Sequence, residues 1–202
     1  MAARIDLLAT GYADTRVAST IVLVRDAGAT IVVDPGMVAE RRMLLRQLDE
    51  LRTPPDTVTD VVLSHHHPDH TLNAALFGNA RFHDHWAIYK GDMWEERAGD
   101  GRALSPSVRL LATPGHTHED ITTLVESEEG LVACTHLWWS VGGPEVDPLA
   151  VDQSLLERSR AKLLDLHPVL IIPGHGAPFI PGDLPTRASR VADETLQWHE
   201  AP

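Results

Sequence analysis

The stretch Leu63-Ser64-His65-His66-His67-Pro68-Asp69-His70 decides how this chain folds, because five of its eight residues can bind a transition metal. The apolar run 61–63 at its start predicts a buried strand. Pro68 favours extended backbone at His67 and can open a helical turn. We therefore expect the histidines where a strand ends.

Spacing decides which of these side chains can converge. On extended backbone, residues two apart project to the same side, so His65 and His67 point together while His66 points away. A helical turn after the proline would bring Asp69 and His70 toward a second point nearby. One short loop could thus serve two neighbouring ions.

Two further motifs follow predicted strands, Thr113-Pro114-Gly115-His116-Thr117 and Pro173-Gly174-His175-Gly176. Together with His65-x-His67-x-Asp69-His70, they resemble the metallo-β-lactamase superfamily. The run 157–179 is similar to its short, single-domain branch that includes metallo-β-lactamase domain-containing protein 1. The resemblance implies an α/β fold, an αβ/βα four-layer sandwich of two packed mixed β-sheets with helices outside.

The same resemblance implies a set of metal ligands. His65, His67 and His116 correspond to one site, and Asp69, His70 and His175 correspond to the second. It implies one or two zinc ions and leaves iron and manganese open. Asp34-Pro35-Gly36 also matches a family motif, in which Asp34 either orients a ligand or merely forms a turn.

The chain departs from the family at Thr135-His136, where a Gly-Asp pair usually supplies a carboxylate that bridges both metals. Neutral imidazole offers one free nitrogen and no charge, so His136 could bind one ion but could not bridge two as a carboxylate does. Two divalent ions, a hydroxide and Asp69 then leave a net charge of +2, which is costly. Three states follow: two metals held unevenly or farther apart, one metal, or two metals completed by an anionic substrate.

Composition narrows the class of partners. The 202 residues, 43% hydrophobic and without a Pro/Gly/Ser-rich linker, favour a single domain over 1–202. A net charge of −12 disfavours nucleic acid, and the chain has no room for the inserted domain of the superfamily's nucleases. We expect a small-molecule substrate, which can be anionic, no membrane association and a cytoplasmic location, since Cys134 is the only cysteine. Homodimerisation is left open.

Hydrophobic periodicity predicts the remaining elements. Strands are expected over 4–9, 19–24, 30–34, 60–64, 81–85, 108–113, 121–126, 131–135 and 169–172. Helices are expected over 38–51, 71–77, 152–166 and 185–199. The segment 86–107 has no clear pattern, and its aromatic residues could line a pocket or pack in the core.

Several polar or aromatic residues have two interpretations. His83 and His85 share a face, but no partner motif follows them, which favours surface or hydrogen-bonded histidines. The run 118–120 follows His116 closely, and one of its residues could replace the missing carboxylate. Trp138 and Trp139 are adjacent, so on extended backbone one should pack inward and one should face the cleft.

The residues favour a metal-dependent hydrolase that acts on an ester, lactone, thioester, amide or phosphoester. Metal-bound water would be the nucleophile, and Asp69 would orient it or accept its proton. A second hypothesis is a mononuclear iron oxygenase resembling the persulfide dioxygenases, with His65, His116 and His136 as ligands. A third is a degenerate member that only binds its ligand.

Overall fold

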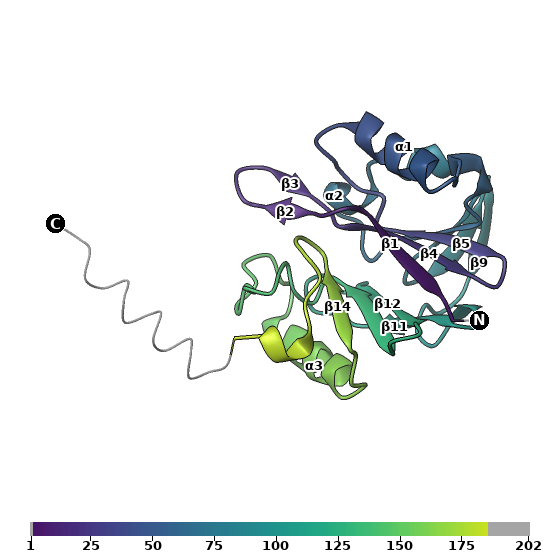
Figure 1. The fold of residues 1–202 in the computed structure, drawn as a ribbon. Helices are drawn as coiled ribbons and strands as arrows, with labels where there is room; N and C mark the ends of the chain where they lie inside the picture. Colours follow the sequence, from purple (N-terminus) through teal and green to yellow (C-terminus); the bar gives the residue numbers. More distant parts are fainter. Residues whose placement is uncertain (1, 186–202) are drawn as a thin grey trace.

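Two β-sheets face each other in the computed structural model, which describes residues 2–185, and each sheet carries one long helix on its outer side (Figure 1). Within these residues the larger sheet has seven strands in the order β1-β4-β5-β6-β7-β8-β9. The strands of this sheet are β1 (Arg4–Ala9), β4 (Ile21–Asp26), β5 (Ala29–Val33), β6 (Asp60–Val62), β7 (Arg81–His83), β8 (Ala87–Lys90) and β9 (Met93–Glu96).

The second sheet has five strands in the same described range, in the order β10-β11-β12-β13-β14. They are β10 (Ala103–Ser105), β11 (Val108–Ala112), β12 (Ile121–Glu126), β13 (Leu131–Thr135) and β14 (Leu170–Pro173). A small hairpin of β2 (Tyr12–Ala13) and β3 (Val17–Ala18) projects beside the sheets (Figure 1). Helical segments are α1 (Arg41–Glu50), α2 (Pro68–Thr71) and α3 (Gln153–Leu164), with 3-10 turns over Pro55–Thr57, Ala74–Phe77 and Pro181–Asp183.

Three buried apolar clusters hold the layers together. The inner faces of both sheets meet in a cluster of mainly valine, isoleucine and leucine, including Val33, Val62 and Leu110. Leu44 and Leu48 of α1 pack on the outer face of the first sheet, and Leu156 and Leu163 of α3 pack on that of the second. Since strand side chains alternate between faces, central strands such as β4, β5 and β13 contribute to an inner and an outer cluster. The expected αβ/βα four-layer sandwich is confirmed.

The direction of the strands explains where polar loops gather. β5 and β6 are parallel, as are β6 and β7, and β13 and β14. The carboxyl ends of parallel strands meet at the same edge of a sheet. The loops after β5, β6, β13 and β14 therefore begin at shared edges, and the second sheet faces the first across the core.

The prediction differs from the observed elements over 71–77 and over 86–107. The helix expected over 71–77 is instead the short helix α2, which begins at Pro68, followed by a 3-10 turn, because proline is favoured in the first helical turn. The unassigned segment 86–107 contains β8, β9 and β10. The helix expected over 185–199 lies outside the described residues.

The helix predicted over 152–166 is observed as α3, and its start has a clear cause. Asp152 is its N-cap, and the side-chain Oδ1 accepts a hydrogen bond of 2.9 Å from the backbone N–H of Leu155. Among residues 2–185, no helix is long and apolar enough to cross a membrane.

Candidate metal centre

Three histidine nitrogens converge at the edge where the loops meet. His67 Nδ1 lies 3.0 Å from His65 Nε2 and 3.1 Å from His116 Nε2. Ligand atoms on a tetrahedral zinc ion, at about 2.0–2.1 Å from the metal, are roughly 3.3 Å apart. The loop after β6 and the loop after β11 thus place three donors at a spacing that suits one ion.

A second group of donors lies beside the first. Asp69 Oδ2 is 3.5 Å from both His70 Nε2 and His175 Nε2. His136 Nε2 lies 3.2 Å from His175 Nε2. The ligand atoms of His70, His136 and His175 all lie within 4.8 Å of one another, as do those of His65, His116 and His136. The predicted ligand residues are therefore brought together from both sheets.

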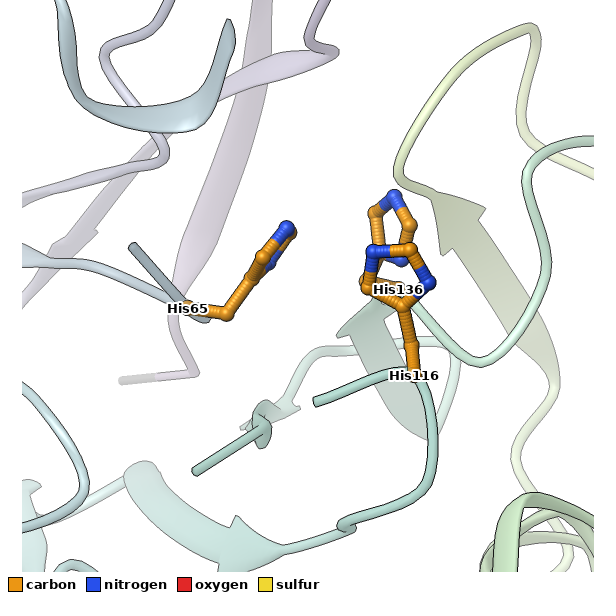
Figure 2. Close-up of side chains that lie close together, drawn as sticks. All are labelled: His65, His116 and His136. Carbon is orange, nitrogen blue, oxygen red and sulfur yellow. The ribbon is translucent and has the colours of Figure 1, made fainter. Parts of the chain in front are cut away.

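His136 lies where the two groups meet. Figure 2 shows its ring beside that of His116, with the ring of His65 opposite; the ring centroids are 4.2 Å and 4.6 Å from that of His136. The ring fits because residue 174 is glycine: a Cβ there would lie 2.2 Å from His136 Cδ2. Burial and the neighbouring histidines hold the pKa of His136 well below its usual value, which keeps the ring neutral and able to bind a metal.

Four of the histidines are oriented by acceptors behind them. The acceptors are Asp147 Oδ2 for His116 Nδ1 at 2.8 Å, Asp34 Oδ2 for His70 Nδ1 at 2.9 Å, the Ala18 carbonyl for His175 Nδ1 at 2.8 Å, and Ser64 Oγ at 3.0 Å from His65 Nδ1. An N–H directed outward leaves the Nε2 lone pair directed inward. The fold thus fixes the tautomers that ligation needs.

One buried nitrogen at the centre supports a metal directly. His70 Nε2 is buried and has no hydrogen-bond partner among the described residues. An unsatisfied buried polar atom typically costs about 1–3 kcal/mol, so such atoms in a protein call for a ligand. A donor set of six imidazoles and one carboxylate suits zinc and also iron. The residues present therefore fit a metal centre.

Asp34 has the supporting position that its motif suggests. Its carboxylate accepts hydrogen bonds of 2.7 Å from both the N–H and the Oγ–H of Ser64, besides its contact with His70. The backbone of Asp34 has φ +51°, an uncommon conformation that fixes the carboxylate under the metal loop.

Asp120 does not replace the missing bridging carboxylate. It lies behind His65, with Oδ1 3.5 Å from His65 Nδ1 and Oδ2 accepting from the N–H of Thr117. Burial raises the pKa of Asp120 to about 7. Of the three candidates in 118–120, this residue is buried near the centre, but it lies on the outer side of a ligand.

Asp147 is a functional residue that no sequence motif predicts. It follows β13 in an irregular segment without a motif, and its carboxylate joins His116 to the indole N–H of Trp139, which donates at 3.1 Å. The sequence signal for it is its position shortly before a predicted helix. Aspartates are common at such positions, so this signal does not indicate a role at the metal centre. Its function becomes visible through the contact with His116.

A cavity of about 550 Å³ opens beside the two groups of ligands. Trp139 faces it, whereas Trp138 is buried against Phe179, as the expected alternation requires. No lysine or arginine belongs to its wall among the described residues. The wall is formed by Ala13, Asp14, Val17, His67, Pro68, Asp69, His116, His136, Trp139, Leu149 and His175.

Other histidines and aromatic residues lie apart from this centre. His66 points away from its neighbours and stacks on Trp86, with ring centroids 5.4 Å apart. His83 is buried and hydrogen-bonded to Asp60 at 2.7 Å. Trp86 is 49% exposed and Trp94 is 64% exposed, so neither packs in the core. Neither belongs to the cavity wall.

Comparison with known proteins agrees with this geometry. The family model described as the Metallo-beta-lactamase superfamily matches residues 14–175. Metallo-beta-lactamase domain-containing protein 1 from Xenopus laevis is 36% identical over 163 residues, which cover 74% of this chain and 67% of that protein. The Homo sapiens protein of the same name is 33% identical over 162 residues, covering 76% of this chain and 60% of the relative. The chain thus spans about two thirds or less of the length of these relatives.

Solved structures share the fold at lower identity. A Thermotoga maritima protein described as a metallo-beta-lactamase aligns with TM-score 0.70 and 22% identity, covering 90% of this chain and 100% of that chain. A quorum-quenching N-acyl homoserine lactone lactonase aligns with TM-score 0.66 and 19% identity, covering 86% of this chain and 91% of that chain. Both similarities concern the architecture alone.

Proposed function

This chain belongs to the metallo-beta-lactamase superfamily, and on that premise we propose that it is a metal-dependent hydrolase of small molecules. The observation that carries the proposal is the convergence of His65 Nε2, His67 Nδ1 and His116 Nε2 at 3.0–3.1 Å around His67, beside an accessible cavity. The candidate bonds are those of an ester, lactone, thioester, amide or phosphoester.

The ligands have separate tasks in the proposed reaction. A zinc ion held by these three histidines would lower the pKa of its bound water toward 7 and so supply a nucleophile. Asp69 lies at the cavity wall and can accept the proton of that water, because a carboxylate has two acceptor oxygens and Oδ2 alone contacts His70 and His175. Zinc, rather than iron or manganese, is part of the proposal.

The cavity wall favours some substrates over others. Val17, Leu149 and the indole of Trp139 give it apolar surface, and no cationic side chain lines it among residues 2–185. Recognition of phosphate or carboxylate normally uses arginine or lysine. We therefore place uncharged esters, lactones and thioesters with an apolar group ahead of phosphoesters and ahead of the anionic substrate considered from the sequence.

The test compares zinc-loaded and chelator-treated protein on matched substrates. Short-chain and medium-chain esters, lactones and thioesters, an amide and a phosphodiester are assayed at equal concentration. Hydrolysis by the zinc-loaded protein that is lost on chelation and restored by zinc supports the proposal. Absence of hydrolysis in a fully loaded, folded sample would leave the binding-only alternative.

One observation supports a second candidate, a mononuclear oxygenase. His65, His116 and His136, the trio expected for that case, have ligand atoms within 4.8 Å of one another. Neutral ligands favour Fe(II) less than a carboxylate would, so this function ranks second. Freshly purified protein containing iron and consuming O₂ with a persulfide would support it, and zinc without O₂ uptake would exclude it.

The cytoplasmic location, the single domain over 1–202, the lack of nucleic-acid partners and a homodimer stay predictions. Size-exclusion chromatography with light scattering would measure the oligomeric state. Cell fractionation would test the compartment.

A further inference from the structure

We propose that the two groups of ligands form two unlike metal sites, a closed site of Asp69, His70, His136 and His175 and an open site of His65, His67 and His116. The inference builds on the metal-dependent function proposed above and deepens it. It concerns what the replacement of the bridging carboxylate by His136 does to this chain's own ligand geometry.

His136 has ligand atoms within 4.8 Å of both groups, and its shortest nitrogen–nitrogen contact assigns it to one of them. Its Nε2 lies 3.2 Å from His175 Nε2, close to the roughly 3.3 Å expected for two nitrogens on one tetrahedral ion. A neutral imidazole has one lone pair, so His136 cannot serve both groups at once. The other group already has its third donor, because His67 Nδ1 lies within 3.1 Å of both His65 Nε2 and His116 Nε2.

The number of donors then makes the two sites different. Asp69 Oδ2, 3.5 Å from His70 Nε2 and from His175 Nε2, completes a group of four with His136. Four protein ligands fill a tetrahedral shell and leave no position for water, which is typical of structural sites. Three histidines leave the fourth position free, which is typical of catalytic sites.

Carboxylates behind the ligands compensate the charge that a bridging carboxylate would have supplied. Asp34 accepts from His70 on the closed side, and Asp147 accepts from His116 on the open side. Negative charge is therefore distributed to the outer side of each site, so two ions do not need a shared anionic ligand between them.

The experiment counts metal ions in single and double variants. Protein is stripped, reconstituted with zinc, freed of excess metal and measured by mass spectrometry of the metal, and cobalt-loaded samples are measured by visible absorption. We expect two ions per chain in the wild type, and one in His136→Ala, His70→Ala or His67→Ala. The matched control His118→Ala, which removes an exposed histidine near the same loop, should keep two.

Double variants decide which group His136 belongs to. His136→Ala with His70→Ala should still hold one ion, because both changes remove the same site. His136→Ala with His67→Ala should hold none. In cobalt-loaded protein, adding an anion such as azide should change the spectrum of His136→Ala, which keeps the open site, and leave that of His67→Ala unchanged.

Several outcomes would overturn the proposal. They are a single ion in the wild type, two ions in His136→Ala, or one ion in the double variant that lacks both His136 and His67. Far-UV circular dichroism establishes folding, and His136→Gln replaces His136→Ala if the smaller side chain prevents folding. Two ions with the expected pattern but no hydrolysis would refute the proposed function while leaving the site assignment intact.

Discussion

The Asp60 cluster on the first sheet and the metal centre between the sheets each contain a buried histidine, and they differ in how the nitrogens of that histidine are satisfied. In the Asp60 cluster, consisting of Asp60, Arg81, His83 and Arg97, the buried imidazole has both nitrogens satisfied. Arg97 Nη2 lies 2.6 Å from His83 Nδ1, so His83 Nε2 carries the hydrogen that it donates to Asp60 Oδ1 at 2.7 Å.

The metal centre lacks this completeness. His70 Nδ1 is hydrogen-bonded to Asp34, while His70 Nε2 has no hydrogen-bond partner among the described residues. The imidazole of the first cluster is fully hydrogen-bonded within the protein, although Arg97 Nε has no partner among the described residues, whereas the imidazole of His70 needs a further atom. A buried histidine nitrogen thus indicates function where its hydrogen bonding is incomplete and other ligand atoms converge beside it. His85 Nδ1 is also buried without a partner, but among the described residues His85 belongs to no such group.

The largest effect should come from removing a ligand at the open site. We expect His67→Ala to reduce hydrolysis below detection, because the two remaining histidines hold zinc poorly and turnover depends on the metal-bound water. Steady-state assay at saturating zinc measures this. His83→Ala, which removes a histidine of the Asp60 cluster, should keep the metal, and equal losses in both variants would break the contrast between the clusters.

The next effect should be on stability at the Asp60 cluster. Asp60 is fully buried and accepts 2.9 Å and 3.1 Å hydrogen bonds from Arg81 as well as the bond from His83. Asp60→Ala should lower the free energy of unfolding by about 3 kcal/mol, at the lower end for a broken buried pair because Arg81 is half exposed. Urea unfolding of metal-free protein measures it, with exposed Asp92→Ala as control; a loss under about 1 kcal/mol would contradict the proposed role.

A smaller effect should follow from weakening an outer acceptor at the metal centre. Asp147→Asn keeps the size of the side chain but removes the charge that faces His116 Nδ1 at 2.8 Å. We expect metal affinity at the open site to fall about 10–100-fold, with the fold retained. Competition with a chromogenic chelator measures it, and Asp92→Asn is the matched control. An unchanged affinity would show that Asp147 holds Trp139 in the cavity wall and does not support the metal ligand His116.

The smallest effect should be the acid sensitivity of the Asp60 cluster. Burial raises the pKa of Asp60, but hydrogen bonds from His83, Arg81 and Thr59 outweigh it and lower the pKa to about 2. Since the pKa in the unfolded chain is about 3.9, the carboxylate stabilises the fold above pH 4 and loses this contribution as pH falls toward 2. Metal-free wild type should lose about 1 kcal/mol more than Asp60→Asn between pH 5 and pH 3 in urea unfolding. Parallel pH profiles would exclude the linkage.

The sequence predicted the sandwich and its long helices because hydrophobic alternation and the position of the motifs are local signals. The same spacing appears in His65-x-His67 and His83-x-His85, yet these pairs have different surroundings. What separates them is distant in the sequence: His116 and His175 return to the first pair's edge, and Asp60 and Arg97 enclose His83. Such partners follow from topology, which spacing within a single loop does not contain.

The contact of Asp147 with His116 and the strands within 86–107 could not be predicted from local sequence either. Asp147 lies in an irregular segment, where no periodicity indicates which way a carboxylate points. β8 and β9 form an edge hairpin with Met93 and Trp94 exposed, so burial leaves no alternating pattern in their sequence. The sequence leaves the role of His136 open, because that role depends on which other ligand residue lies beside its Nε2.

The contact between position 174 and the ring of His136 limits how this centre can change. Because a methyl group at 174 would occupy the space of the imidazole Cδ2, alanine is compatible only with a smaller residue at 136. Any attempt to restore an aspartate at 136 can therefore vary 174 as well, whereas a histidine at 136 permits glycine alone. Directed evolution of a different metal chemistry should randomise the two codons as a pair.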